Sequence, residues 1–136
     1  KEALRLVAPV PGMARKAIKD TELLGHFVPK GSMISVPIQH LHTRAELWPD
    51  PDAFDPERFS AERREDKVHR YAYLPFGGGA HKCIGMFFGG MEVKSVLHHL
   101  LRTTTWSVPA DYVMPVDRLS LPKPKDGLPV HLNHRR

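Results

Sequence analysis

Residues 76–85 read Phe76-Gly77-Gly78-Gly79-Ala80-His81-Lys82-Cys83-Ile84-Gly85 and contain the single cysteine of this 136-residue chain. The stretch runs into a segment whose apolar residues recur at offsets of three and four, which is the period of an α-helix. We expect Cys83 at the junction of a glycine-rich loop and the N-terminus of this helix, where unpaired amides, the helix dipole and adjacent basic residues favour a thiolate. Glycines at 77–79, 85, 89 and 90 leave room for a flat ligand to approach the backbone.

Three interpretations of Cys83 remain open on this pattern alone. The thiol can be an inert core residue, a nucleophile paired with His81 but lacking an orienting partner, or an axial thiolate to haem iron. One cysteine excludes an internal disulfide and a four-cysteine cluster. The spacing Phe-x-x-Gly-x-basic-x-Cys-x-Gly has a chance expectation on the order of 10⁻⁷ per start position for this composition, so coincidence explains it poorly.

Outward from this stretch, hydrophobic periodicity and 13 prolines predict an α+β chain of one domain. The expected elements are a helix end at 1–8, extended pieces of a small sheet at 13–19, 26–28 and 32–38 with separators at 20–25 and 29–31, a helical turn at 40–48, a proline-rich meander at 48–56, an exposed charged loop with some helical character at 60–70, the long helix after the cysteine, and short strands and hairpins at 106–132.

The net charge of +5 lies entirely in residues 69–136, whereas residues 1–68 are balanced. This distribution predicts an acidic partner surface for the second half. The basic residues are dispersed and no aromatic stacking pattern accompanies them, so nucleic acid is not an expected partner. We expect no membrane-spanning segment, because no apolar run approaches the required length.

Three motifs together resemble the haem-thiolate monooxygenases of the cytochrome P-450 superfamily. Glu2-Ala3-Leu4-Arg5 is similar to the family's Glu-x-x-Arg helix, Pro56-Glu57-Arg58-Phe59 to its Pro-Glu-Arg-Phe segment, and residues 76–85 to its cysteine-ligand loop. The resemblance extends from Lys1 to about Leu132 and covers only the C-terminal portion of the family's mainly helical fold. It implies that residues 1–136 are the haem-binding part of a single domain whose N-terminal part, including the distal oxygen-activating helix, is absent.

The resemblance also implies a role for each matching residue. Glu2, Arg5 and Arg58 would form a buried charge network that holds the meander; the first two stand one helical turn apart and share a face. The cofactor-binding residues implied for haem b (iron protoporphyrin IX) are Cys83 as axial ligand, His81 and Arg15 at the propionates, Phe76 beside the thiolate, and Gly79 and Gly85 in the loop. No catalytic side chain is assigned within the chain.

The implied reaction is insertion of one atom of O₂ into a small organic, lipophilic substrate. Electrons would come from a ferredoxin- or flavoprotein-type donor, for which Lys82 and Lys94 are candidate docking residues. Residues 10–13 and 119–121 are expected to line the substrate pocket. The expected location is intracellular: cytoplasmic in a bacterium, at the endoplasmic reticulum membrane in a eukaryote. The alternatives are a non-catalytic haem-binding protein and an inactive truncated fragment.

Four further histidines, at positions 40, 42, 98 and 99, are not expected to bind a metal or to take part in catalysis. His40 and His42 are expected on one face of a strand, and His98 and His99 on a helix, where neighbours point different ways. Neither pair has the further ligands that a zinc site needs. We expect these side chains to be exposed or at helix C-termini.

Overall fold

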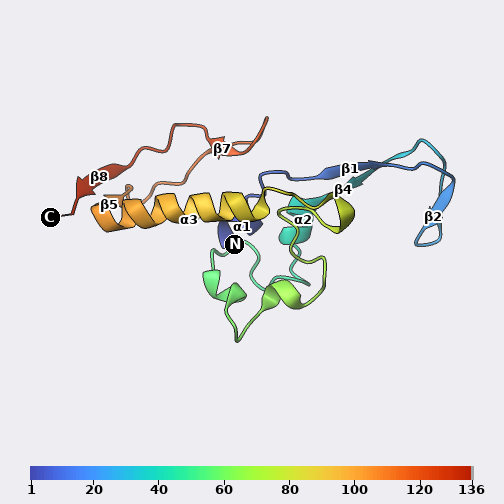
Figure 1. The fold of residues 1–136 in the computed structure, drawn as a ribbon, viewed down its shortest axis with the longest axis horizontal. Coiled ribbons are helices and arrows are strands. Elements are labelled where there is room, and N and C mark those ends of the chain that lie inside the picture. The colour runs from blue at the N-terminus through green and yellow to red at the C-terminus, as the bar shows by residue number, and fades with distance from the viewer. Residues whose placement is uncertain (136) are drawn as a thin grey trace. The chain divides into compact units, whose positions relative to one another are not determined.

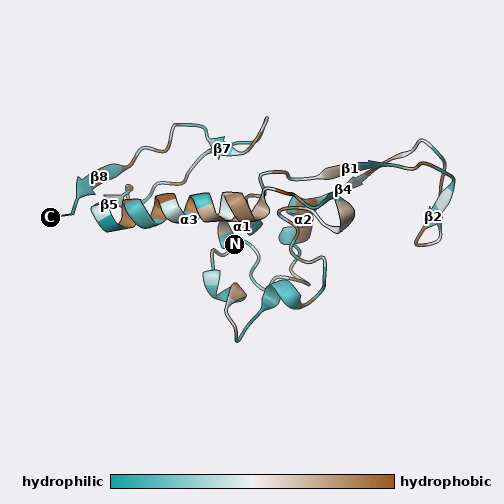
Figure 2. Ribbon diagram, in the orientation of Figure 1, coloured by the Kyte–Doolittle hydropathy of each residue, from teal (hydrophilic) through white to brown (hydrophobic). Residues whose placement is uncertain are grey.

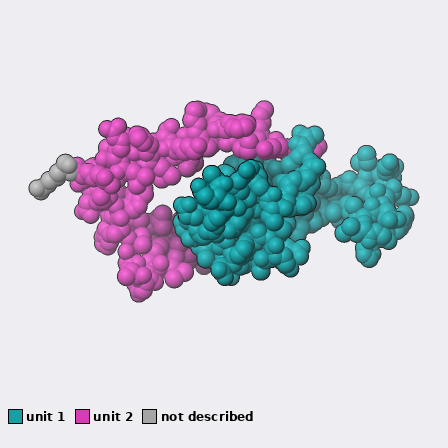
Figure 3. Space-filling view, turned by 90° about the horizontal axis from the view of Figure 1, so that it is seen from below, with its two compact units in different colours: residues 1–80 teal, residues 81–136 magenta. Residues whose placement is uncertain are grey.

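The structure, a computed structural model, describes residues 1–135. The chain forms two compact units, Lys1–Ala80 and a second that begins at His81 (Figure 3). Figure 1 labels the elements of both units. Within the described residues, no helix combines the length and the apolar character that a membrane span requires.

The first unit opens with α1 (Glu2–Leu6), a single short helix whose end is marked by Val7, φ −132°. Pro9 and Pro11 follow, and the missing amide of proline prevents the helix from continuing. Both charged residues of α1, Glu2 and Arg5, are buried. The helix therefore turns its polar residues inward.

Two separate antiparallel pairs follow in place of one small sheet. The first joins β1 (Met13–Lys16) to β4 (Met33–Val36), with Arg15 opposite Ile34. The second is the hairpin of β2 (Thr21–Leu23) and β3 (His26–Val28).

The expectation of a plain separator at residues 20–25 is therefore wrong, because β2 lies inside it. The turn between β2 and β3 consists of Leu24 and Gly25, with φ of 50° and 82°. Positive φ at both central residues is the geometry that matches the twist of paired strands. Leucine rarely adopts it, so residue preferences gave no warning of this hairpin.

The short helix expected at 40–48 is α2 (Ile38–His42), which begins two residues earlier and ends six residues sooner. The meander that follows has no regular structure until the short 3₁₀ helix η1 (Pro56–Phe59), where the Asp55 side chain accepts a hydrogen bond from the Glu57 amide. The charged loop contains a second 3₁₀ turn, η2 (Glu65–Lys67). Asp66 in this turn is buried, so the loop is not wholly exposed as expected.

The interior of the first unit is small and mixes apolar with charged side chains. Its buried apolar residues are Ala8, Ala17, Ile38, Trp48 and Ala72. Its buried polar and charged residues are Glu2, Arg5, His42, Arg58 and Asp66. This unit is therefore organised around buried charges as much as around apolar contacts.

The second unit is dominated by α3 (Met86–Thr103), the long helix that the periodicity predicts. None of its residues is buried, and its ribbon carries brown apolar residues among polar ones (Figure 2). At its end the Thr104 hydroxyl donates to the Leu100 carbonyl at 2.7 Å. Two strand pairs follow, β5 (Thr104–Ser107) with β8 (His131–His134) and β6 (Val116–Asp117) with β7 (Lys123–Pro124). The expected short strands are present, but β5 and β8 pair across the intervening β6 and β7 and do not form a hairpin.

Candidate functional site

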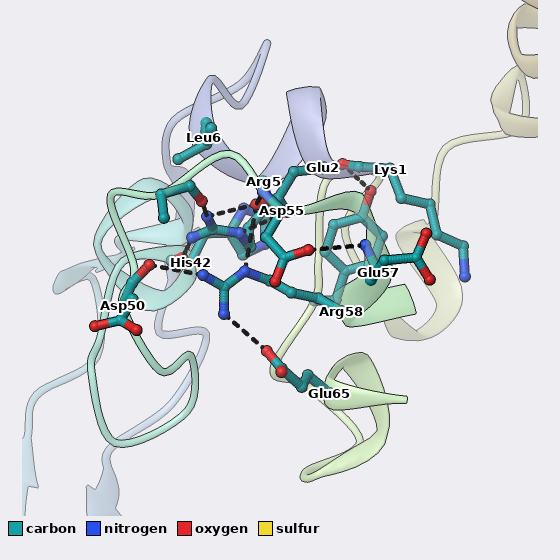
Figure 4. Close-up of polar contacts among 12 residues, drawn as sticks. Lys1, Glu2, Arg5, Leu6, His42, Asp50, Asp55, Glu57, Arg58 and Glu65 are labelled. Carbon is teal, nitrogen blue, oxygen red and sulfur yellow. Dashed lines mark hydrogen bonds and ion pairs between the residues drawn. The ribbon is translucent and has the colours of Figure 1, made fainter. Parts of the chain in front are cut away.

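Three charged side chains from two distant segments meet in the first unit. Arg5 donates two hydrogen bonds to Glu2, from Nε to Oε2 and from Nη2 to Oε1, both at 2.8 Å. The Nε of Arg58 lies 3.4 Å from Glu2 Oε1. Exposed fractions are 3% for Glu2, 0% for Arg5 and 2% for Arg58. The structure thus brings the three motif charges together out of water, as Figure 4 shows.

The remaining donors of both arginines reach backbone carbonyls of the chain between residues 42 and 53. Arg5 donates from Nη1 to the His42 carbonyl at 2.8 Å and from Nη2 to the Ala53 carbonyl at 3.1 Å. Arg58 donates from Nη2 to the Asp50 carbonyl at 2.7 Å and from Nη1 to the Pro49 carbonyl. These bonds fix a segment that proline excludes from regular structure, so the arginines replace the missing backbone pairing.

A second carboxylate, Glu65, completes the network and was not anticipated from the sequence. Its Oε2 accepts from Arg58 Nη1 at 2.9 Å, and its Oε1 accepts from Arg63 Nε at 3.0 Å. Glu65 sits in a run of alternating charges typical of a solvated loop, and nothing in that run distinguishes it. With Glu65, the two buried guanidinium groups face two carboxylates, which offsets part of the cost of burying charge.

The network holds its carboxyl groups in the ionised form. Burial alone would raise the pKa of Glu2, but hydrogen bonds from Arg5 and from the Asp55 amide, with the charges of Arg5 and Arg58, lower it below its ordinary value. Glu65 follows the same pattern: burial opposes ionisation, and Arg63 and Arg58 together lower the pKa. Both groups stay charged at neutral pH.

An aromatic cluster lies beside the charges. Phe59 and Tyr73 pack edge to face with ring centroids 5.1 Å apart, and Trp48 lies 5.8 Å from Phe59. The guanidinium of Arg5 stands 5.4 Å from the Trp48 ring. Trp48 is fully buried, and an aromatic residue among prolines is the signal that could have identified it as an anchor.

His42 belongs to this cluster and corrects the sequence interpretation. It lies on helix α2 rather than on a strand, and as the last residue of α2 it has the helix C-terminal position that was one of the two expected. Its side chain is fully buried, whereas His40 is exposed. Four residues separate His42 from the buried Ile38, which is the spacing of one helix face and the signal that could have identified it. His98 and His99 lie on α3 and are exposed, as expected.

The cysteine loop lies at the junction that the sequence predicts, directly ahead of the long helix. Cys83 precedes α3: Gly85 is the N-cap residue and Met86 the first helical one, so the thiol does not lie in the first helical turn. Its side chain is exposed. Before it, Gly77 and Gly79 have a φ of 69° each, a conformation that favours glycine. Gly77 turns the chain ahead of the short 3₁₀ helix η3 (Gly79–His81), and Gly79 is the first residue of that helix.

The residues around Cys83 fit a flat apolar cofactor held by a thiolate. A Cβ atom built on Gly79, Gly89 or Gly90 would meet nothing within 4 Å. Next to the thiol in sequence, Ile84 is 99% exposed and Phe87 81% exposed. A large apolar surface beside an accessible thiol suits haem, for which cysteine is a known axial ligand.

The other predicted ligands are placed as follows. His81 is exposed in η3, and Phe76 is partly buried. Arg15 is exposed on β1, where its guanidinium donates to the Ala14 carbonyl at 2.9 Å. A Cβ on Gly85 would stand 3.8 Å from Cys83 Sγ, an ordinary contact. The propionate roles of His81 and Arg15 stay predictions.

Known proteins resemble the chain along nearly its whole length. The family model described as Cytochrome P450 matches residues 1–130. A relative from Mycobacterium tuberculosis that carries the name cytochrome P450 136 is 47% identical over 135 residues, which are 98% of this chain and 27% of the relative. Cytochrome P450 3A27 of Oncorhynchus mykiss is 38% identical over 137 residues, which are 99% of this chain and 26% of that relative.

Solved structures agree with the sequence relatives. The cyanobacterial CYP120A1, solved with bound retinoic acid, superimposes with a TM-score of 0.89 at 35% identity, over 98% of this chain and 31% of that one. The haem domain of cytochrome P450DA superimposes with a TM-score of 0.86 at 36% identity, over 99% of this chain and 30% of that one. The chain thus spans about a third or less of the proteins it matches. Their shared sequence and fold show that it belongs to the cytochrome P450 family.

Proposed function

We propose that residues 1–136 are the C-terminal, haem-holding part of a monooxygenase, and we refer to the longer haem domain that would contain them as the complete protein. The family consists of haem-thiolate monooxygenases, and the matched relatives are three to four times as long as this chain. The exposed thiol of Cys83, next to open glycines and exposed apolar side chains, is the observation that carries the proposal.

In this proposal haem supplies the iron centre at which dioxygen is reduced. The chain's own residues would bind and orient it: the Cys83 sulfur would ligate the iron, and Gly79 and Gly85 would keep side chains away from the ring. His81 and Arg15 would donate to the propionates, since both carry N–H groups suited to carboxylates. Phe76 limits access of water to the sulfur, which influences the reduction potential.

The charge network has a supporting role in the proposal. Arg5 and Arg58 donate to the meander carbonyls described above, and Glu2 accepts from the Asp55 amide at 3.1 Å. A rigid meander would keep the chain leading to the cysteine loop in one conformation. The buried charges are therefore proposed to be structural rather than catalytic.

The partners follow from charge and from the relatives. Lys82 and Lys94 are exposed and lie in the basic half of the chain, which favours a ferredoxin- or flavoprotein-type electron donor with an acidic surface. The substrate would be a small lipophilic molecule, and the retinoic acid bound to CYP120A1 gives a first compound to test. An intracellular location would give access to such a donor; the matched relatives come from both bacteria and animals.

The test is a turnover experiment with isotopically labelled dioxygen. The complete protein, supplied with a ferredoxin or flavoprotein reductase and retinoic acid or a panel of lipophilic compounds, should yield a product carrying one labelled oxygen atom. Haem binding without any labelled product across the panel would support the non-catalytic alternative. A separate haem titration of residues 1–136 should give no stable thiolate-ligated spectrum, because the apolar contacts of one haem face would be unmade.

A further inference from the structure

His42 is a buried titratable residue that the proposed chemistry does not use. Its exposed fraction is 0%, and it lies at the end of α2 between α1 and the segment Tyr71–Phe76. Two different parts of the residue are bonded to these two neighbours. Its backbone carbonyl accepts from Arg5 Nη1 at 2.8 Å, and its ring Nε2 accepts from the Leu74 amide at 2.9 Å. Figure 4 shows His42 beside Arg5.

The bond to Leu74 determines which nitrogen of His42 carries the proton. A neutral imidazole has one donor and one acceptor nitrogen, and the Leu74 amide can only donate. Nε2 must therefore be unprotonated and the proton must reside on Nδ1. Protonation of Nε2 would place two donors 2.9 Å apart and break the contact.

The surroundings favour this neutral form. Burial lowers the pKa of His42 to about 4; the Arg5 backbone opposes the change in part, and the Arg5 charge adds to it. The titratable groups that face the ring are Arg5 with its partner Glu2 from α1, and Tyr73, whose ring stacks on His42 at 5.4 Å. Burial, with the charges of Asp66 and Glu2, raises the pKa of Tyr73, so this ring stays neutral too.

His42 also carries a cost that an apolar residue would not. Its Nδ1 is buried and has no hydrogen-bond partner among residues 1–135. Phenylalanine would fill a similar volume, keep the stacking on Tyr73 and remove this unpartnered group. It would, however, leave the Leu74 amide without an acceptor, and an unmade backbone hydrogen bond is costly. The acceptor at Nε2 is thus the property that histidine adds here.

Leu74 connects this bond to the start of the cysteine loop. Its carbonyl accepts from the Gly77 amide at 3.0 Å, which closes the turn in which Gly77 has φ 69°. Its side chain also packs closely on the next glycine, because a Cβ on Gly78 would lie 3.3 Å from Leu74 Cδ2. Cys83 follows Leu74 by nine residues.

We propose that His42 is a positioning residue that acts through Leu74: its neutral Nε2 ties the Glu2–Arg5–Arg58 network to the turn that leads into the cysteine loop. This inference rests on the proposed haem-thiolate function for its consequence, but its geometry concerns residues 2–78 alone. Protonation of His42, or its replacement by a residue without an acceptor at this place, frees the Leu74 amide and loosens the entry to the loop. In the haem-loaded protein, the Cys83 thiolate ligand is then lost at a higher pH during acidification.

The direct test is ¹⁵N NMR of histidine-labelled, haem-loaded complete protein at neutral pH. His42 should show an unprotonated Nε2 and a proton on Nδ1; the opposite tautomer would overturn the proposal without any variant being needed. Hydrogen exchange of the Leu74 amide is then compared in His42→Phe and His42→Gln. We expect about tenfold faster exchange in the phenylalanine variant, which lacks the acceptor, and exchange close to wild type in the glutamine variant, which retains one.

The spectroscopic readout separates positioning from plain folding. In the ferrous carbon monoxide complex, acidification toward pH 4 should convert wild-type protein to the form without thiolate, whereas His42→Gln, which cannot titrate, should convert at lower pH. Equal acid profiles for both proteins, or unchanged Leu74 exchange in His42→Phe, would contradict the proposal while leaving the haem-thiolate function intact. If wild-type protein itself shows no thiolate-type spectrum at neutral pH, the proposed function fails instead.

Discussion

The two units of this chain place charged and apolar residues in opposite ways. In the first unit, Glu2, Arg5 and Arg58 are at most 3% exposed. In the second, α3 buries none of its residues, and Phe87 and Phe88 are 81% and 66% exposed. Folded proteins ordinarily bury apolar groups and expose charges. The contrast teaches that the first unit pairs most of its buried charge internally, although His42 Nδ1, Trp48 Nε1 and Arg58 Nε have no hydrogen-bond partner among residues 1–135, whereas α3 leaves its apolar residues exposed.

The largest expected effect follows from breaking the charged interior. Glu2→Gln would leave Arg5 and Arg58 buried without their shared carboxylate, so we expect the free energy of unfolding to fall by about 3–5 kcal/mol. Urea unfolding of the complete protein measures this change. The matched control is Glu46→Gln in the exposed Arg44–Glu46 pair, where we expect no measurable loss. Similar losses in both variants would contradict a special role for the buried network.

The network also predicts how stability depends on pH. The pKa of His42 is lowered from its ordinary 6.5 to about 4 in the folded protein, so its neutral form stabilises the fold above pH 6.5, and this contribution is lost as pH falls toward 4. Glu2 and Glu65, whose pKa values are lowered from 4.5, lose their contribution only below that value.

Between pH 6.5 and 4.5, His42 is therefore the one of these three groups that changes stability. We expect a slope of up to about 1.4 kcal/mol per pH unit in urea unfolding curves of the complete protein. The slope should be shallower in His42→Gln over the same range. A glutamine variant with the wild-type slope would show that another group titrates there.

The sequence predicted the elements better than the contacts. Periodicity located α3, because its apolar spacing persists over many residues, and prolines located the meander. The β2–β3 hairpin was missed because its turn uses Leu24 at positive φ. Arg5 and Arg58 were predicted as partners of Glu2 from the family resemblance. The spacing of charges could not predict them, since surface and buried charges look alike in a sequence.

The roles of Glu65 and His42 depend on tertiary contacts over separations that no local pattern encodes. His42 Nε2 accepts from an amide 32 residues away, and Arg58 reaches Glu65, seven residues on, because η2 packs against η1. The glycine-rich loop and the helical period placed Cys83 at the start of α3, but no sequence signal identified Gly85 as the N-cap residue. Such features follow from how the chain packs.

In the second unit, substitution of Gly89 should change two quantities in opposite ways: helix stability should rise and haem affinity should fall. A Cβ there meets nothing within 4 Å, so Gly89→Ala should stabilise the helix by about 1 kcal/mol, the difference in helix propensity. The same methyl group should weaken haem binding if this face lies against the ring. Helix stability is measured by thermal unfolding of the haem-free protein and affinity by haem titration. Unchanged affinity would argue that haem does not contact Gly89.

The smallest expected effect concerns the basic surface. Lys82→Glu and Lys94→Glu should slow electron transfer from an acidic donor at low ionic strength, and the difference should shrink as salt is added. Stopped-flow reduction of the haem measures the rate. Lys30→Glu, an exposed substitution in the charge-balanced half of the chain, serves as control. Equal rates for all three variants would remove the second half from the docking surface.

The central claim is that Cys83 binds the haem iron through its sulfur. The most direct measurement is the carbon monoxide difference spectrum of the reduced, haem-loaded complete protein, compared between wild type and Cys83→Ser. We predict a red-shifted thiolate-type band for the wild type and its disappearance in the serine variant, whose hydroxyl is a far weaker anionic ligand. A serine variant that retains the red-shifted band would contradict the claim.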